Sequence, residues 1–212
     1  MAGSRSERLA PLAGLVFIAL AIASGILSGS TPDANDTTVG VAGFWKVHDN
    51  KEIVSALLGG VGVVFFLWFL GSLWATLRRA EPEPGRVSAT VFGGFLVFAV
   101  GILSVLAFQF AAADVADDSG VAPQVVQTLS VLQSDFFLPL SGGLIVGMLA
   151  SAVAILRFRA FPRWLGGVAL ISGILFFTPG FFIGLILAGL WVIAMSILMF
   201  RTGGAPIARE AA

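Results

Sequence analysis

The chain consists of long uncharged hydrophobic runs separated by short polar segments that carry most of its charge. About 20 apolar residues in an α-helix cover the roughly 30 Å hydrocarbon layer of a membrane. The runs predict six spans, at residues 9–29, 53–77, 88–113, 124–157 (including an outer extension), 164–178 and 181–200. The pattern therefore predicts an all-α membrane protein, a single domain over residues 1–212 folded as a six-transmembrane-helix bundle.

The last uncharged run is too long for one crossing. Residues 164–200 contain no charge, and as a single helix they would extend about 55 Å, nearly twice the hydrocarbon thickness. Thr178-Pro179-Gly180 is a strong turn signal within this run. The run therefore predicts a helical hairpin whose first arm, the fifth span, is short.

The first run has two interpretations. Arg5 and Arg8 precede it, and Ala21-Ile22-Ala23 resembles a signal-peptidase site, so a cleaved signal peptide is one possibility. The apolar part is longer than a usual signal-peptide core, which favours a retained first helix.

Residues 30–52 are rich in Thr, Asp and Gly and predict an outer loop, with Val41 and Trp45 in a short interfacial amphipathic segment. Asp49 and Glu52 have the spacing of a capping box directly before the second span. They predict that the second helix begins there.

Among the predicted spans, only the fourth has an ionisable side chain away from its ends. Pro123 predicts the start of this helix, Asp135 borders its uncharged part, and Pro139 predicts a kink because it cannot donate to the Asp135 carbonyl group. Gly143 and Gly147 continue the same ridge, where another helix could approach closely.

The distribution of Lys and Arg predicts the orientation. With both termini cytoplasmic, all ten Arg lie inside and only Lys46 and Lys51 lie outside. Four carboxylates lie inside and eight outside, so the inner face is positive and the outer face negative. The expected location is a bacterial cytoplasmic membrane, because the preference for Arg over Lys and the Ala, Gly and Val content suggest a high-GC genome.

Polar residues at the outer edge of the bundle form the candidate ligand site. Counting from the arginines puts Asp135 and Gln109 at similar depth. With Gln133, His48 and Glu52 they could line an outward-facing vestibule, because an ionisable residue in a span suggests function. The alternative is that Asp135 faces interfacial water or makes a structural polar contact.

Two further patterns have a structural and a functional interpretation. His48, Asp49 and Glu52 could bind a divalent metal, but one histidine favours helix capping instead, and no metal site is predicted. The pairs Gly143/Gly147 and Gly180/Gly184 have small-xxx-small spacing, which favours packing within the monomer over a dimer face.

Several activities lack the residues that they require. The chain has no cysteine, one histidine and no lysine within a predicted span, which excludes thiolate metal sites, a bis-histidine haem and a retinal Schiff base. No Walker-type glycine loop or zinc-protease helix is present, and no basic stripe suggests nucleic acid. We expect no enzyme activity, catalytic residues or cofactor.

Three short motifs carry a family resemblance: Phe44-Trp45-Lys46-Val47-His48, Phe66-Leu67-Trp68-Phe69-Leu70-Gly71 and Phe161-Pro162-Arg163-Trp164-Leu165-Gly166. With the overall arrangement, the chain from Val39 onward resembles uncharacterised multi-pass membrane proteins of high-GC bacteria, a domain of unknown function. The resemblance implies a helical inner-membrane protein and no reaction or substrate.

The sequence therefore leaves three functional hypotheses. The first and leading one is a non-enzymatic structural or accessory membrane component, or a binder of a lipid-like ligand. The second is a small transporter or ion-coupled carrier that uses Asp135 with Gln109 at an outer vestibule. The third, an intramembrane enzyme, would need a second catalytic carboxylate close to Asp135. Membrane lipids are the expected partners, with a homo-oligomer or a partner membrane protein left open.

Overall fold

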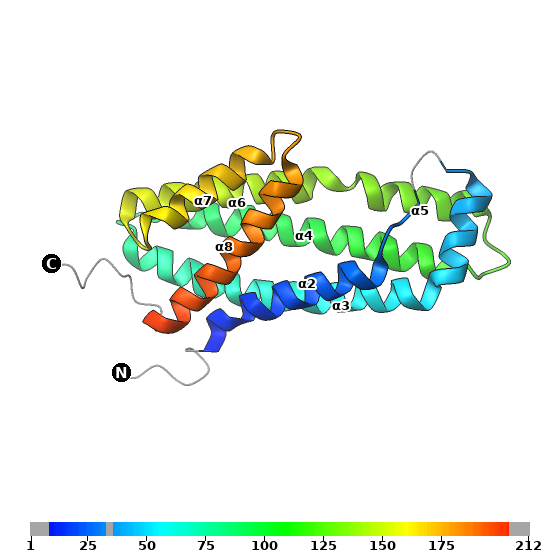
Figure 1. The fold of residues 1–212 in the computed structure, drawn as a ribbon, viewed down its shortest axis with the longest axis horizontal. Coiled ribbons are helices and arrows are strands. Elements are labelled where there is room, and N and C mark those ends of the chain that lie inside the picture. The colour runs from blue at the N-terminus through cyan, green and yellow to red at the C-terminus, as the bar shows by residue number, and fades with distance from the viewer. Residues whose placement is uncertain (1–8, 33–35, 204–212) are drawn as a thin grey trace.

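The computed structural model describes residues 9–32 and 36–203, and every regular element in these ranges is helical. Arg5, Arg8, Asp33 and Arg209 of the predicted charge pattern lie outside the described residues. The elements are η1 (Ala10–Leu12), α2 (Ala13–Ser28), α3 (Thr38–Ala80), α4 (Arg86–Val115), α5 (Pro123–Asp135), α6 (Phe137–Phe158), α7 (Arg163–Leu175) and α8 (Phe181–Thr202). In Figure 1, α4, the α5–α6 pair and most of α3 run along the long axis, while the first turns of α3 cross one end of the bundle. Helices α2, α7 and α8 lie against them.

The described helices have the length and composition of a membrane protein. Five are long and apolar enough to cross a bilayer, when α5 and α6 count as one, and α7 is a shorter apolar helix. The all-helical fold with five to six such helices is therefore confirmed. The 13 residues of α7 extend only about 20 Å, and Figure 1 shows the α7–α8 turn partway along the bundle rather than at its end.

The two ends of the bundle carry opposite charge. We call the arginine end the one where α3 and α6 finish and α7 begins; it holds Arg78, Arg79, Arg86, Arg157, Arg159, Arg163 and Arg201. The other end, the acidic end, holds Lys46 and Lys51 and the carboxylates of Asp36, Asp49, Asp114, Asp117, Asp118 and Asp135.

Helix α3 begins far earlier than the sequence predicted. It starts at Thr38, capped by the Thr37 hydroxyl, which accepts a hydrogen bond from the Gly40 N–H at 3.2 Å. The predicted loop is therefore wrong from residue 38 to residue 52. Because Asp49 and Glu52 lie in the interior of a 43-residue helix, their predicted capping function is also wrong.

A second hydrophobic core explains the extension of α3. Val41 and Trp45 are fully buried against Ala112 and Ala113 of α4 and Val126 of α5. Thr38 also donates to the Gln127 side chain at 2.6 Å, and Lys46 pairs with Asp117 at 3.1 Å. Packing of an apolar face stabilises a helix more than intrinsic propensity does, so these contacts keep the polar segment helical.

The fourth predicted span is divided at Phe136, whose ψ angle of 37° is not helical. Pro139 is the third residue of α6, in the first turn, where a helix does not need its N–H. Pro123 begins α5, as predicted. The division lies three residues before the proline because a proline cannot donate to the carbonyl group four residues earlier, here that of Asp135.

Helices α4 and α6 pack backbone against backbone. A Cβ on Gly143 would lie against the Phe98 backbone nitrogen and 2.8 Å from the Gly94 carbonyl oxygen, and one on Gly94 would lie 2.9 Å from the Gly147 Cα. Further along, a Cβ on Gly101 would lie 2.7 Å from the Leu140 Cα. Backbone meets backbone along this glycine seam (Gly94, Gly101, Gly143 and Gly147), as small residues allow in membranes.

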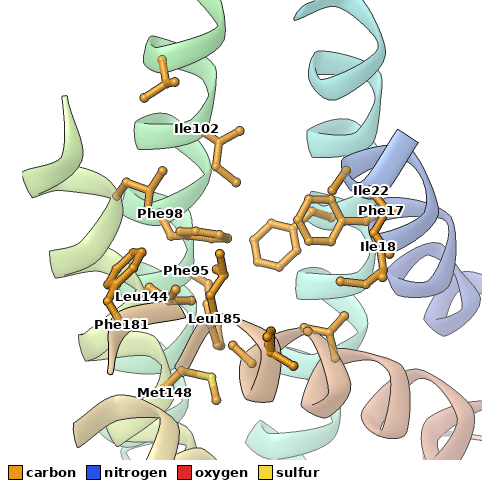
Figure 2. Close-up of a pocket in the computed structure, with 18 of the residues that line it drawn as sticks. Phe17, Ile18, Ile22, Phe95, Phe98, Ile102, Leu144, Met148, Phe181 and Leu185 are labelled. Carbon is orange, nitrogen blue, oxygen red and sulfur yellow. The ribbon is translucent and has the colours of Figure 1, made fainter. Parts of the chain in front are cut away.

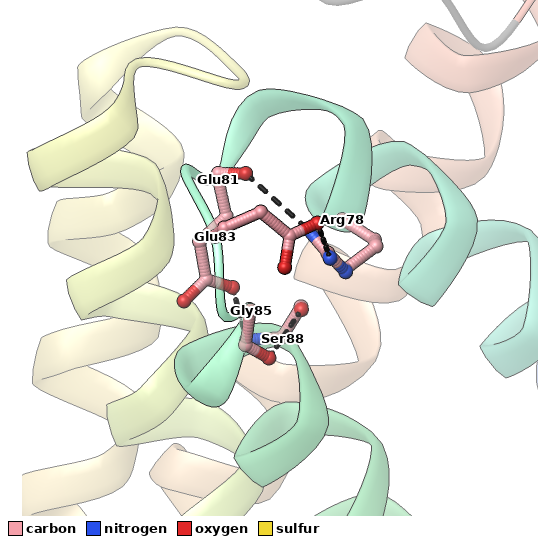
Figure 3. A network of polar contacts seen from close by, with 5 residues as sticks. All are labelled: Arg78, Glu81, Glu83, Gly85 and Ser88. Atoms are coloured by element: carbon pink, nitrogen blue, oxygen red, sulfur yellow. Dashed lines mark hydrogen bonds and ion pairs between the residues drawn. The ribbon is translucent and has the colours of Figure 1, made fainter.

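The turn between α3 and α4 is fixed by an acidic side chain (Figure 3). The two carboxylate oxygens of Glu81 accept hydrogen bonds from the N–H groups of Val87 and Ser88, at 2.8 and 2.7 Å. Figure 3 draws Glu81 together with Ser88 and Arg78. Burial would raise the pKa of the Glu81 carboxyl, but these N–H groups and the Arg78 charge outweigh burial and hold the pKa below its ordinary value of 4.5. Glu81 thus satisfies two of the free amides of α4 and complements its dipole.

Candidate functional site

Helix α2 is attached to α3 along its length. The Ser24 hydroxyl donates to the Ser55 carbonyl oxygen at 2.9 Å, and the Ser55 hydroxyl donates to the Ser24 carbonyl oxygen at 2.9 Å. Gly62 of α3 leaves room for α2, since a Cβ there would lie 3.3 Å from the Leu20 Cβ. These contacts hold α2 on α3.

Helix α8 is attached to a different neighbour, α7. The Ser172 hydroxyl donates to the Gly184 carbonyl oxygen at 2.8 Å, and the Trp191 indole donates to the Leu165 carbonyl oxygen at 3.2 Å. Helix α8 also meets α2 where Gly14 packs against Ser196. Beyond this crossing the two helices diverge toward the acidic end (Figure 1).

The divergence leaves an open cavity of about 700 Å³, which we call the groove. Its floor is formed by buried side chains of α3, α4 and α6, including Phe66, Phe95 and Met148. Figure 2 shows Phe17, Ile18 and Ile22 of α2 facing Phe95, Phe98 and Ile102 of α4 across it. The exposed side chains of Ile22 and Ile186, 58% and 63% accessible, lie at its mouth.

Only two of the residues that line the groove have polar side chains, Gln133 and Ser134. Both belong to the last turn of α5, next to the division at Phe136. The Oε1 atom of Gln133 is buried without a hydrogen-bond partner, and the Ser134 hydroxyl donates to the Ser130 carbonyl oxygen at 3.1 Å. The groove is therefore apolar along its length and carries two polar side chains at one end, where the Gln133 Oε1 atom is an unpaired acceptor.

The groove extends over about half of a bilayer's hydrocarbon thickness. On α4 its lining runs from Phe95 to Val105, which is about 15 Å of helix, against about 30 Å for the whole layer. Phe95 lies about 14 Å from Arg86 at the start of α4, by the same rise per residue. The groove thus occupies the half that is distant from the arginine end.

A buried polar cluster lies between the groove and the second core. The Glu52 side chain is fully buried, and its Oε2 atom accepts from the Ser28 hydroxyl at 2.6 Å and from the Gln109 amide at 2.9 Å. Gln109 also donates to the Glu52 carbonyl oxygen at 3.2 Å. This cluster joins α2, α3 and α4 at the depth where the groove ends.

The five predicted site residues occupy different surroundings. Glu52 and Gln109 meet in the buried cluster, and Gln133 lines the groove. His48 bonds the Phe44 carbonyl oxygen through Nδ1 at 2.9 Å and stacks on the Phe44 ring. Asp135 is exposed. The contacts thus pair Gln109 with Glu52, where the vestibule hypothesis paired it with Asp135.

The residues described do not bring three or more His, Cys, Asp or Glu side chains together as a metal site. Of the predicted packing glycines, Gly143 and Gly147 meet α4, and Gly184 lies against Leu175 of α7. Gly180 also faces Leu175.

Sequence reasoning missed the groove, and it placed Glu52 and Gln109 in an outer vestibule rather than in a buried cluster with Ser28. The groove is lined by ordinary apolar residues from five helices, so no local pattern marks it. A signal for the cluster did exist, because Val41, Trp45 and Glu52 recur at helical spacing and share a buried face of α3.

Comparison with known proteins gives a family but no activity. A family model described as a domain of unknown function, DUF4386, matches residues 12–182, which is most of the chain. The match includes the groove lining from α2 to α6, whereas most of the lining from α8 lies beyond residue 182. No curated protein and no solved structure matches.

Proposed function

The chain belongs to the DUF4386 family, and we propose that it is a non-enzymatic membrane protein that binds one acyl chain of a lipid-like amphiphile in its groove. The observation that carries the proposal is the groove itself, which is apolar except at one end. Small-molecule sites are mostly apolar cavities of about 300–1,000 Å³ with a few polar groups, and a volume of about 700 Å³ falls within that range.

The length of the groove favours an acyl chain over a more compact ligand. A lining of about 15 Å along α4 equals half of the roughly 30 Å hydrocarbon layer, which is the reach of a chain in one leaflet. The mouth between α2 and α8 is bordered by exposed Ile22 and Ile186, so a chain can enter sideways from that leaflet. No passage through water is needed.

The charge distribution supports the orientation. If Lys and Arg concentrate on the cytoplasmic side, the arginine end is cytoplasmic and the groove opens to the outer leaflet of a cytoplasmic membrane. The carrier hypothesis has less support, because Gln109 bonds Glu52 and Asp135 is exposed.

The test is a substitution that fills the groove. Gly189 of α8 lines it, and a Cβ there would lie 3.8 Å from the Ile18 side chain, so Gly189→Leu places its larger side chain in the groove without a backbone clash. The matched control is Gly142→Leu, because Gly142 is exposed and a Cβ on it would meet nothing within 4 Å. Binding of a 14-carbon lysolipid to detergent-solubilised protein is followed by native mass spectrometry.

We expect the wild type and Gly142→Leu to bind the lysolipid, and Gly189→Leu to lose at least about tenfold in affinity, since filling the cavity removes contacts over much of the chain. Equal binding by all three proteins would overturn the proposal. So would a change in the ratio of monomer to dimer without a change in lipid binding, because the groove would then receive a helix of a second copy.

A further inference from the structure

The polar end of the groove has the properties of a headgroup site. Gln133 and Ser134 are adjacent on α5, and they are the only polar side chains in the lining. An amphiphile whose chain lies along the apolar part would bring its first polar atoms to this end. This step rests on the proposed function, because it requires a chain in the groove.

The buried hydrogen-bonding atom without a partner at this end is an acceptor. The Gln133 Oε1 atom is buried and has no partner, which is unfavourable until a donor reaches it. The Ser134 hydroxyl already donates its proton to Ser130, which leaves its oxygen able only to accept. A headgroup that donates hydrogen bonds would satisfy the Gln133 Oε1 atom and the Ser134 oxygen.

The surrounding charge is negative. Asp135 lies two residues after Gln133 and is exposed, and the acidic end holds six exposed or partly exposed carboxylates against two lysines. One of the lysines, Lys46, is paired with Asp117, and the other, Lys51, donates to the Ser28 carbonyl oxygen at 3.1 Å. Like charges repel, so this end disfavours an anionic headgroup.

We infer that Gln133 and Ser134 form a headgroup subsite that selects amphiphiles whose headgroup donates hydrogen bonds and carries no net negative charge. An ammonium headgroup meets both conditions. The acceptor atoms determine the need for a donor, and the carboxylates determine the sign of the charge.

Three lysolipids with the same 14-carbon chain separate these two conditions. Lysophosphatidylethanolamine is zwitterionic and its ammonium group donates, lysophosphatidylcholine is zwitterionic and its quaternary ammonium cannot donate, and lysophosphatidylglycerol donates through hydroxyls and is anionic. The wild type should bind the ethanolamine lipid about fivefold more tightly than either of the others, the size expected for one or two hydrogen bonds.

Three variants test whether the preference for the ethanolamine lipid comes from Gln133 and Asp135. Gln133→Leu should lower the affinity for the ethanolamine lipid to that for the choline lipid and leave the choline lipid unchanged. Gln124→Leu, at an exposed position of the same helix that does not line the groove, should change neither. Asp135→Asn should raise the affinity for the anionic lipid alone.

Two outcomes overturn this inference without touching the proposed function. They are equal binding of the three lipids by a wild type whose binding is lost in Gly189→Leu, and an ethanolamine preference that survives Gln133→Leu. Failure of the proposed function looks different, because Gly189→Leu would then bind every lipid as the wild type does.

Discussion

The α4–α6 pair and the α2–α8 pair are both neighbouring apolar helices, yet one is closed and the other open. Along the glycine seam, Gly94 and Gly143 bring two backbones into contact, and α4 and α6 stay together over most of their length. Helices α2 and α8 touch near Gly14 and Ser196 and then separate to form the groove.

The difference lies in what else holds each helix. Lipid chains are as apolar as the side chains of a membrane helix, so the hydrophobic effect does not drive two apolar helices together within a membrane. Their association requires close packing or hydrogen bonds instead. Helices α4 and α6 have this close packing along the glycine seam. Helix α2 is hydrogen-bonded to α3, and helix α8 is hydrogen-bonded to α7. Few interactions therefore hold α2 and α8 to each other.

The largest effect is expected from a substitution that pushes α4 and α6 apart at the glycine seam. Gly143→Leu forces a side chain into the α4 backbone near Phe98 and Gly94 and should destabilise the fold by about 3 kcal/mol or more, because backbone cannot yield as a flexible side chain can. The measurement is the melting temperature in mild detergent. Gly142→Leu, one position away and exposed, should melt like the wild type. Equal melting of the two variants would mean that the seam is not tightly packed.

A second test concerns the wall of the groove formed by α2. Gln109→Leu removes a hydrogen-bond donor from the buried Glu52 side chain and should cost about 1–3 kcal/mol, because the Oε2 atom of Glu52 loses a partner that water cannot replace. Chemical unfolding in detergent measures the loss. The double variant Glu52→Leu/Gln109→Leu should recover part of it, since the buried Glu52 oxygen that lost its Gln109 donor is then also gone. No recovery would show that Gln109 acts by packing alone.

A third test uses pH at the arginine end, where Glu81 fixes the start of α4. The folded state lowers the pKa of Glu81 below 4.5, so its stabilising effect, about 1 kcal/mol for a helix cap, is present above the unfolded pKa and is lost as the pH falls through the folded one. Wild type should melt higher than Glu81→Gln at pH 7, and the difference should shrink below about pH 4.5. A difference that grows on acidification would contradict the assignment.

The smallest effect on stability is expected at the groove. Gly189→Leu should leave the melting temperature unchanged or raise it by the equivalent of about 1 kcal/mol, because leucine is the better helix former and the groove has room. A destabilisation like that of Gly143→Leu would mean that α2 and α8 are as tightly packed as the seam.

The sequence predicted most of the fold, because long uncharged runs and short arginine-bearing turns depend on local composition. It placed the α7–α8 turn at Thr178-Pro179-Gly180 and the start of α5 at Pro123. It failed at residues 38–52, where the composition resembles a loop, and Val41 and Trp45 become helical through burial against α4 and α5.

The candidate site was predicted less well. Gln109, Gln133 and Glu52 were predicted to line one outer vestibule, and Glu52 and Gln109 do meet. Their pairing depends on which faces of α3 and α4 turn toward each other, which depth alone does not specify. The groove had no sequence signal, since its apolar lining matches that of any span.

The sequence by itself determined that the chain is a helical membrane protein with charge separated between two ends. The reason is that each residue's preference for lipid or for water depends on its own side chain, so the apolar runs are visible without the fold. Only the tertiary structure decided where the helices close and where they part. A seam needs backbone contact between two particular helices, and a groove needs two helices that are each held by a third, so both are properties of pairs of segments.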